Sequence, residues 1–243
     1  MRRGALVRVI TIALLAAAVA TAVAIFIDWL PAADSKEADR IDFVFWVVVA
    51  ICIGVFAVVT AITVYSVVKF RVRPDDDSDG PPVHGHTGLE IVWTAIPTVL
   101  VTIIALISAV ALAENGDLKS NRLEVDVTAR QFAWSFKYPQ YGGFQSDELR
   151  LVEGRQVQLS LKALDVIHSF CVPEFRQKQD AVPGIVTHLP ITPTKAGKYT
   201  LICTELCGLG HALMRAPVIV MTPTAFDRWA QAQQQRGAQG TSG

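Results

Sequence analysis

The sequence predicts a membrane-anchored all-β protein, in which two or three N-terminal transmembrane helices precede a β-sandwich or small barrel. Three long stretches contain no charged residue, at Val9–Ile27, Phe43–Val68 and Ile91–Ala113. From residue 122 onward the chain alternates polar and apolar residues, and glycine and proline interrupt it at short intervals. The first pattern is typical of helices that cross a bilayer, and the second of short strands joined by tight turns.

Each apolar stretch approaches or exceeds the roughly 20 residues that are needed to cross a bilayer core. Buried helices of soluble proteins rarely stay apolar on every face for that length, so we expect transmembrane helices at residues 43–70 and 90–113. Residues 1–30 form either a signal peptide or a third transmembrane helix. Arginines precede their apolar run, which is long for a signal peptide, and Ala32 and Ala33 make a poor cleavage site.

Basic residues beside the apolar stretches predict the orientation in the membrane. Arg2, Arg3 and Arg8 should stay in the cytoplasm, as should the basic residues in the loop at 71–89. The acidic connector at 34–42 and everything after Ala113 then lie outside. Thr87 precedes Glu90 by three residues, which is the spacing of a capping box and predicts a helix start.

The β domain is expected at residues 120–230. Strand-like alternation occurs at Leu123–Val127, Gln156–Leu161 and Lys198–Ile202. We expect a short closing helix from Thr224 to Gln235 and a disordered tail at 231–243, which is rich in Gly, Ser and Gln. The formal net charge is zero, which gives no reason to expect a nucleic-acid partner.

A cluster of metal-binding residue types follows the last of these strands. Cys203, Cys207, His211 and Met214 fall within one short segment that contains glycine, and His168 ends an earlier strand-like segment. Thiolate, imidazole and thioether are the ligands that copper favours. A structural zinc site would use the cysteines and histidines but not the methionine, and a disulfide would use the cysteines alone. Copper, zinc and a disulfide all remain open at this point.

The wider pattern resembles subunit II of bacterial haem–copper cytochrome c oxidases. The resemblance rests on C-x-E-x-C-G-x-x-H-x-x-M at the metal segment and on D-V-x-H-S around His168. It extends to the segments His84–Trp93, Gln131–Trp134 and Asp180–Gly184, and covers most of the chain up to Trp229. It implies a cupredoxin-like domain on the periplasmic side of a bacterial plasma membrane.

The resemblance also implies a ligand set and a function. Two coppers, the CuA centre, would share two thiolates, and each copper would have one histidine. A thioether and the Glu205 carbonyl would be weak ligands. The six ligand residues are His168, Cys203, Glu205, Cys207, His211 and Met214. The Glu205 carboxylate would bind magnesium at the boundary with subunit I. The complex, with subunits I and III, would pump protons. This chain would accept electrons from a c-type cytochrome and pass them to haem in subunit I, where oxygen is reduced to water.

The chain departs from the family at the expected electron entry. Phe132 stands where many members have tryptophan, whereas Trp134 is retained, and both are candidates for electron entry. Leu164 and Lys137 occupy positions that are often acidic, although Asp165 remains. Weaker electrostatic steering suggests a donor cytochrome that is tethered to the membrane or fused.

Other features leave alternatives open. The chain contains no C-x-x-C-H motif, so we expect no haem in it. By resemblance Glu90 marks the cytoplasmic mouth of a proton path, although a helix cap would explain it equally well. A quinol oxidase subunit would lack the copper ligands, and a nitrous oxide reductase would need a large propeller domain. A membrane-anchored copper-binding or assembly module without a redox role is the third alternative.

Overall fold

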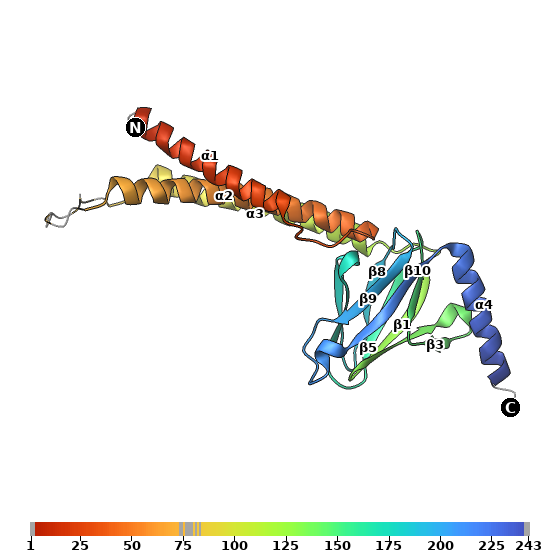
Figure 1. The fold of residues 1–243 in the computed structure, drawn as a ribbon. Helices are drawn as coiled ribbons and strands as arrows, with labels where there is room; N and C mark the ends of the chain where they lie inside the picture. Colours follow the sequence, from red (N-terminus) through yellow and green to blue (C-terminus); the bar gives the residue numbers. More distant parts are fainter. Residues whose placement is uncertain (1–2, 73–74, 76–79, 81, 83, 241–243) are drawn as a thin grey trace. The chain divides into compact units, whose positions relative to one another are not determined.

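The computed structural model describes residues 3–72, 75, 80, 82 and 84–240 (Figure 1). The chain divides into two compact units. Residues 1–30 and 43–110 form a helical unit, and residues 31–42 and 111–243 form a second unit that contains all the strands.

The helical unit contains three helices that are long and apolar enough to cross a membrane. They are α1 (Arg3–Phe26), α2 (Lys36–Lys69) and α3 (Thr87–Gly116). The outer ends of α2 and α3 extend into the second unit. Helices occupy both stretches where transmembrane helices were expected, and the first apolar stretch is also helical. Most large apolar side chains of these three helices are exposed in the isolated chain, as expected of helices whose solvent is lipid.

Helix α3 begins at Thr87 as expected, but its cap differs from the predicted one. The N–H of Leu89 donates to Nδ1 of His86, and the N–H of His86 donates to Oε1 of Glu90. The reciprocal cap therefore joins Glu90 to His86 and not to Thr87. A histidine ring nitrogen accepts the hydrogen bond that a threonine hydroxyl would accept in the usual capping box.

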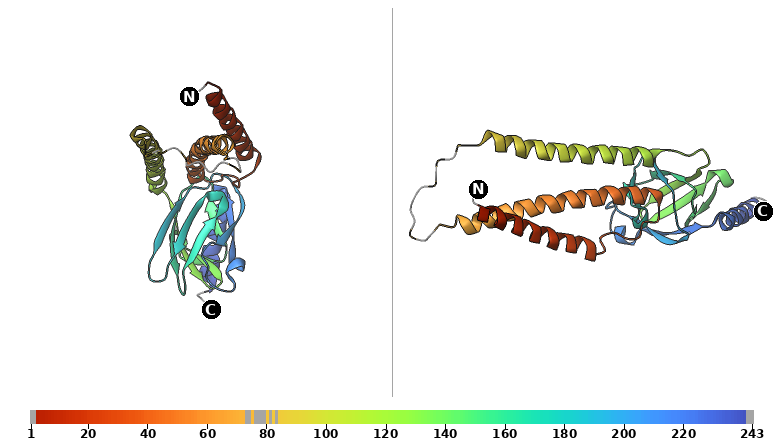
Figure 2. Two further views of the ribbon diagram at one scale, coloured as in Figure 1. Left: turned by 90° about the vertical axis from the view of Figure 1, so that its left-hand side faces the viewer. Right: turned by 90° about the horizontal axis from the view of Figure 1, so that it is seen from above.

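The second unit is a sandwich of two five-stranded sheets, which confirms the predicted fold class (Figure 2). One sheet has the order β3-β2-β1-β5-β8 and the other the order β4-β10-β9-β6-β7. The strands of the first are β1 (Leu123–Arg130), β2 (Ala133–Tyr138), β3 (Phe144–Ser146), β5 (Val157–Ala163) and β8 (Thr187–Ile191). Those of the second are β4 (Leu149–Val152), β6 (His168–Val172), β7 (Gln177–Ala181), β9 (Gly197–Cys203) and β10 (Arg215–Met221).

Alternate residues of the strands build the core between the sheets. In β1, Leu123, Val125, Val127 and Ala129 are all buried, while the residues between them are partly exposed. This period-2 burial is the physical basis of the alternation seen in the sequence. Short 3₁₀ helices at Pro139–Tyr141, Pro173–Phe175 and His211–Leu213 join some of the strands.

The chain ends in helix α4 (Pro223–Gly240), which runs beside β3 (Figure 1). Phe226 and Trp229 anchor it against Tyr138, with ring centroids 6.3 and 5.1 Å away. The expectation of a disordered tail is wrong for residues 231–240, which are helical. Alanine, glutamine and arginine, which make up residues 231–236, are good helix formers and extend a helix that is already anchored. Residues 241–243 lie outside the described residues.

The connector at 31–42 is fixed to the sandwich by charged groups. The guanidinium of Arg176 is 7% exposed and binds both oxygens of Asp42, with Nε–Oδ1 at 2.7 Å and Nη2–Oδ2 at 3.0 Å. The buried carboxylate of Glu37 accepts the N–H of Thr192 at 2.8 Å. Ser35 caps α2, because its hydroxyl accepts the N–H of Ala38. The start of α2 therefore belongs to the second unit.

Candidate metal centre

Strand pairing brings three separate loops to one end of the sandwich. Strands β1 and β5 are parallel, so the loops that follow them, at 131–132 and 164–167, leave at the same end. Strands β6 and β9 are antiparallel, and Phe170 pairs with Cys203. The start of β6, at His168, therefore lies beside the loop at 204–214 that follows β9. Residues far apart in the sequence meet here because of sheet topology.

Two buried thiols lie at the centre of this region. The sulfurs of Cys203 and Cys207 are 3.8 Å apart, and their residues are 7% and 3% exposed. A disulfide requires about 2.05 Å between sulfurs, so the cysteines are not bonded. Burial and the neighbouring Cys203 thiol raise the pKa of Cys207 to about 11. A bound cation would reverse this preference and stabilise the thiolates.

Every ligand named from the sequence lies beside one of these two sulfurs. Nδ1 of His168 is 3.9 Å from Sγ of Cys203, and the carbonyl oxygen of Glu205 is 3.3 Å from it. Nδ1 of His211 is 3.6 Å from Sγ of Cys207, and Sδ of Met214 is 3.8 Å from it. The structure therefore brings together the six residues that the sequence predicted as ligands.

The chemistry of the donors favours copper over zinc. The ligand atoms of His168, Cys203 and Cys207 lie within 4.8 Å of one another, which suits either metal. Met214 is fully buried with its thioether against Cys207. Structural zinc sites take thiolate, imidazole or carboxylate, whereas a weakly bound thioether is typical of copper sites. The residues present thus fit a copper centre.

Asp165 holds the His168 ring in place. Its Oδ1 lies 2.8 Å from Nε2 of His168, which leaves Nδ1 facing the thiols. It also accepts the backbone N–H groups of Gln131 and Val166, both at 2.7 Å. Burial opposes ionisation, but the hydrogen bonds from Gln131, His168 and Val166 outweigh it and lower the pKa of Asp165 to about 2. The sequence suggested Asp165 as a docking charge, and the structure adds this role as a partner of a ligand.

The loop at 131–132 packs against the outside of the loop at 204–214, which we call the metal loop. The side-chain amide of Gln131 donates to the carbonyl of Cys207 at 2.6 Å. The Phe132 ring lies directly against Gly210, where a Cβ would come within 2.5 Å of the ring, and also against Gly208. Phe132 is 40% exposed, so it lies between the metal loop and solvent. Sequence reasoning missed Gln131, whose hydrogen bond depends on the fold and has no local signature.

Trp134 differs from Phe132 in its position. It is 4% exposed, and its ring packs edge-on against His168 and Phe170, with centroids 6.2 and 6.1 Å away. Its indole N–H has no hydrogen-bond partner among the described residues. Trp134 therefore supports the centre from the core, and of the two aromatic candidates only Phe132 has a substantial exposed surface.

Two glutamates that were singled out in the sequence have side-chain contacts elsewhere. The Glu205 carboxylate is partly exposed and lies 3.9 Å from Nζ of Lys178, while only its carbonyl faces the thiols. Glu90 belongs to the helical unit and caps α3 through His86. The structure does not bring Glu90 into the metal centre.

Exposed apolar side chains surround the metal loop. They come from the same three loops, and we call them the apolar collar: Phe132, Leu164, Val166, Ile167, Leu206, Leu209 and Leu213. Leu206 is 80% exposed and Leu213 is 83% exposed. Of the two acidic residues in these loops, Asp165 uses its carboxylate internally and Glu205 lies beside Lys178. Apolar side chains gathered in this way are typical of surfaces that contact a partner.

Comparison with known proteins agrees with this site. The family model described as cytochrome C oxidase subunit II, periplasmic domain, matches residues 146–222, and its transmembrane counterpart matches residues 20–110. Cytochrome c oxidase subunit 2 of Synechocystis sp. is 35% identical over 84% of this chain and 75% of its own length. The protein of that name from Thermostichus vulcanus is 34% identical over 84% of this chain and 78% of its own.

One of the similar solved structures is the periplasmic domain of cytochrome oxidase subunit II (CoxB) of Bradyrhizobium japonicum. It is 26% identical, covers 49% of this chain and 99% of that domain, and superimposes with a TM-score of 0.47.

Proposed function

This chain belongs to the cytochrome c oxidase subunit II family, and from that premise we propose that its two thiols hold the dinuclear CuA copper centre through which electrons enter the oxidase. The chain is a membrane-anchored subunit of an oxidoreductase complex, with its C-terminal domain on the periplasmic side. The reduction of oxygen belongs to the complex as a whole.

One observation carries the proposal: all the expected donors converge on two buried thiols. Cys203 and Cys207 would hold the two ions together with His168, His211, Met214 and the Glu205 carbonyl. The bound coppers would supply one-electron transfer, with the electron shared between them through the thiolates. A single-copper site needs only one thiolate, so the second buried thiol supports a pair.

Backbone hydrogen bonds make the metal loop rigid. The N–H of Cys203 donates to the carbonyl of Met214 at 3.1 Å, and the N–H of Thr204 donates to that of Ser169 at 3.0 Å. Further along, the N–H of His211 donates to the carbonyl of Gly208 at 3.1 Å. These bonds tie the loop to β6 and to itself. A loop held in this way would move little between oxidation states, which favours fast electron transfer.

Electrons would enter at the exposed face of Phe132 from a c-type cytochrome. The ring touches the ligand loop at Gly208 and Gly210 and is the aromatic surface of the apolar collar. Because the collar offers leucines in place of carboxylates, docking would depend on apolar contact more than on charge. A donor that is tethered to the membrane needs little electrostatic steering, because tethering raises its local concentration.

Further partners follow from the family. Electrons would leave for haem in subunit I, and subunit III would complete the proton-pumping complex. The Glu205 carboxylate would bind magnesium at the boundary with subunit I, where hard oxygen ligands suit that ion. Its present partner, Lys178, is partly exposed and could turn away at little cost. Glu90 would lie at the entrance to a proton path.

Electron paramagnetic resonance of the copper-loaded, full-length protein in detergent tests the central proposal. A delocalised copper pair gives a purple protein with a seven-line hyperfine pattern, which Cys207→Ser and His168→Ala should abolish. Cys171→Ser is the matched control, since Cys171 is a free cysteine outside the donor set and should leave the spectrum unchanged. A four-line spectrum, or a colourless protein that retains zinc, would disprove the proposal.

A further inference from the structure

One glutamine is hydrogen-bonded to two of the three loops that form the metal centre. The side-chain amide of Gln131 donates to the carbonyl of Cys207, in the metal loop, at 2.6 Å. The backbone N–H of Gln131 donates to Oδ2 of Asp165, in the loop that follows β5, at 2.7 Å. Gln131 itself lies in the third loop, the one that follows β1. It therefore ties all three loops together.

The two bonds lead to ligands that lie beside different sulfurs. Cys207 is itself one of the two thiols, and its sulfur lies 3.8 Å from that of Cys203. The carboxylate of Asp165 holds the ring of His168, whose Nδ1 lies 3.9 Å from the sulfur of Cys203. Gln131 is thus linked directly to Cys207 and, through one carboxylate, to His168. A shift of this residue would change the spacing between those two ligands.

The metal loop is shaped to admit the Gln131 amide. Gly208 has a φ of 131°, a conformation that L side chains rarely adopt. A Cβ on Gly208 would lie 2.9 Å from Nε2 of Gln131 and 3.2 Å from the Phe132 ring. A larger residue would therefore push the amide away from the carbonyl of Cys207. Cys207 is 3% exposed, so water has little access to that carbonyl as a replacement donor.

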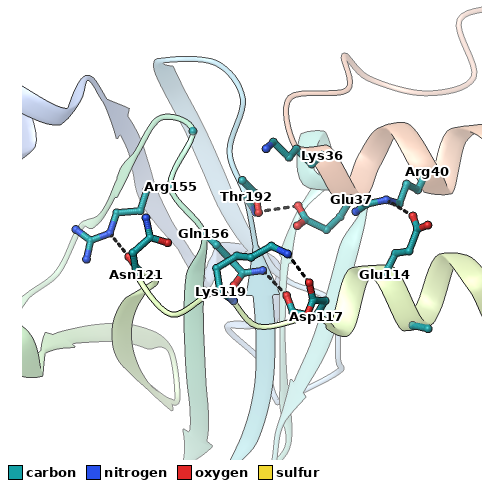
Figure 3. Close-up of a pocket in the computed structure, with 12 residues that line it drawn as sticks. Lys36, Glu37, Arg40, Glu114, Asp117, Lys119, Asn121, Arg155, Gln156 and Thr192 are labelled. Atoms are coloured by element: carbon teal, nitrogen blue, oxygen red, sulfur yellow. Dashed lines mark hydrogen bonds and ion pairs between the residues drawn. The ribbon is translucent and has the colours of Figure 1, made fainter.

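A second glutamine makes bonds of the same kind at the other end of the sandwich (Figure 3). Gln156 precedes β5, whereas the loop at 164–167 follows that strand. Its amide donates to the carbonyl of Asp117 at 2.9 Å, and its side-chain oxygen accepts the N–H of Lys119 at 2.8 Å. Among the described residues, these bonds reach no ligand of the metal centre. Gln156 therefore holds backbone in place without a role at the metal.

We propose that Gln131 is a positioning residue of the copper centre, which fixes Cys207 and His168 relative to one another. The inference rests on the proposed copper pair. Equal sharing of one electron requires that the ligands on both sides keep their positions in both oxidation states. Loss of the side-chain bond would free Cys207, while the bond to Asp165 would persist, because it uses the backbone N–H.

The test replaces Gln131 by methionine, which has a similar length but no hydrogen-bond donor. Gln131 is exposed, so the substitution leaves the core intact. Electron paramagnetic resonance of the copper-loaded, full-length protein in detergent should show a hyperfine pattern altered from that of the wild type. Copper affinity, measured by competition with a chelator, should fall about 10-fold, as is typical when a residue that supports a metal ligand is lost.

Gln156→Met is the matched control, because it removes a glutamine that makes the same kind of bonds far from the ligands. It should lower the midpoint of thermal unfolding and leave the copper spectrum and the copper affinity unchanged. A merely structural role of Gln131 would give the same result as this control. The comparison therefore separates positioning of the ligands from a general loss of stability.

A second measurement needs no copper. Hydrogen–deuterium exchange of the copper-free protein should be faster at residues 204–214 in Gln131→Met than in the wild type, because the carbonyl of Cys207 has lost its donor. Gln156→Met should leave the exchange of this segment unchanged.

Three outcomes would overturn the proposal. Gln131→Met could keep the wild-type spectrum and affinity, it could leave exchange at residues 204–214 unchanged, or Gln156→Met could alter the copper spectrum as much. Each of these results leaves the copper pair in place, because the wild type still shows the seven-line pattern. A wild-type protein without that pattern would instead contradict the proposed function, and this inference with it.

Discussion

The carboxylate of Asp165 lies 2.8 Å from Nε2 of His168 and leaves Nδ1 of the same ring 3.9 Å from the sulfur of Cys203. The ring is fully buried, so its orientation depends on this contact. With the proton held on Nε2, the lone pair of Nδ1 is free to bind a metal. A negative charge behind the ring also makes that lone pair more basic.

Replacing Asp165 by asparagine should weaken copper binding. The amide keeps the shape of the side chain but loses the charge that stabilises the Nε2–H tautomer. Loss of such a partner typically costs about 10- to 100-fold in metal affinity. Competition titration against a copper chelator measures the copper affinity. Asp147→Asn, which alters an exposed aspartate outside the centre, should change nothing, and equal affinities for both variants would contradict the assigned role.

The ligands could be predicted from the sequence because most of them share one short loop. Cys203, Cys207, His211 and Met214 follow one strand, so their proximity needs no knowledge of the fold. His168 required the resemblance as well, since the antiparallel pairing of β6 with β9 brings it to the thiols. The hydrogen bond from Gln131 to Cys207 joins residues 76 positions apart and has no local pattern.

In the fold, too, local features could be predicted from the sequence and long-range contacts could not. The transmembrane helices were predictable because the bilayer demands long apolar runs, a property of local sequence. The attachment of the connector at 31–42 was not, since Arg176 meets Asp42 across 134 positions. The cap of α3 was assigned to the wrong partner because a histidine ring, His86, accepts the bond expected of Thr87.

Replacing Gly210 by alanine should destabilise the metal loop through Phe132. A Cβ at this position would come within 2.5 Å of the ring, closer than packed atoms tolerate. We expect a loss of about 1–3 kcal/mol, the usual cost of overpacking. The midpoint of thermal unfolding measures the change.

A double variant separates this clash from other effects of the substitution. Phe132→Ala removes the ring, so Gly210→Ala should cost much less in the Phe132→Ala background. Gly197→Ala is a suitable control, because the atom nearest to an added Cβ there, the Tyr199 hydroxyl oxygen, lies at 3.4 Å. If both backgrounds lose the same stability, the ring is not the cause.

Electron transfer from the donor should depend on the apolar collar and only slightly on salt. Charge-steered reactions slow steeply as ionic strength rises, whereas apolar docking does not. Changing Leu206 and Leu209 to glutamine should therefore lower kcat/KM for a c-type cytochrome severalfold. Leu118→Gln, an exposed leucine outside the collar, is the control. A steep fall in turnover with added salt would favour a soluble, charge-steered donor instead.

Breaking the pair between Arg176 and Asp42 should detach the connector at 31–42 from the sandwich. The guanidinium is 7% exposed, and it also donates to the carbonyl of Pro173 at 3.0 Å. Arg176→Gln leaves the Asp42 carboxylate without its cation, and removing one partner of a buried pair costs about 3 kcal/mol. Arg228→Gln, at an exposed site on α4, should be neutral. Adding Asp42→Asn should recover part of the lost stability, because no unpaired charge then remains. A double variant no more stable than Arg176→Gln would show that the charge pair is not what holds the connector.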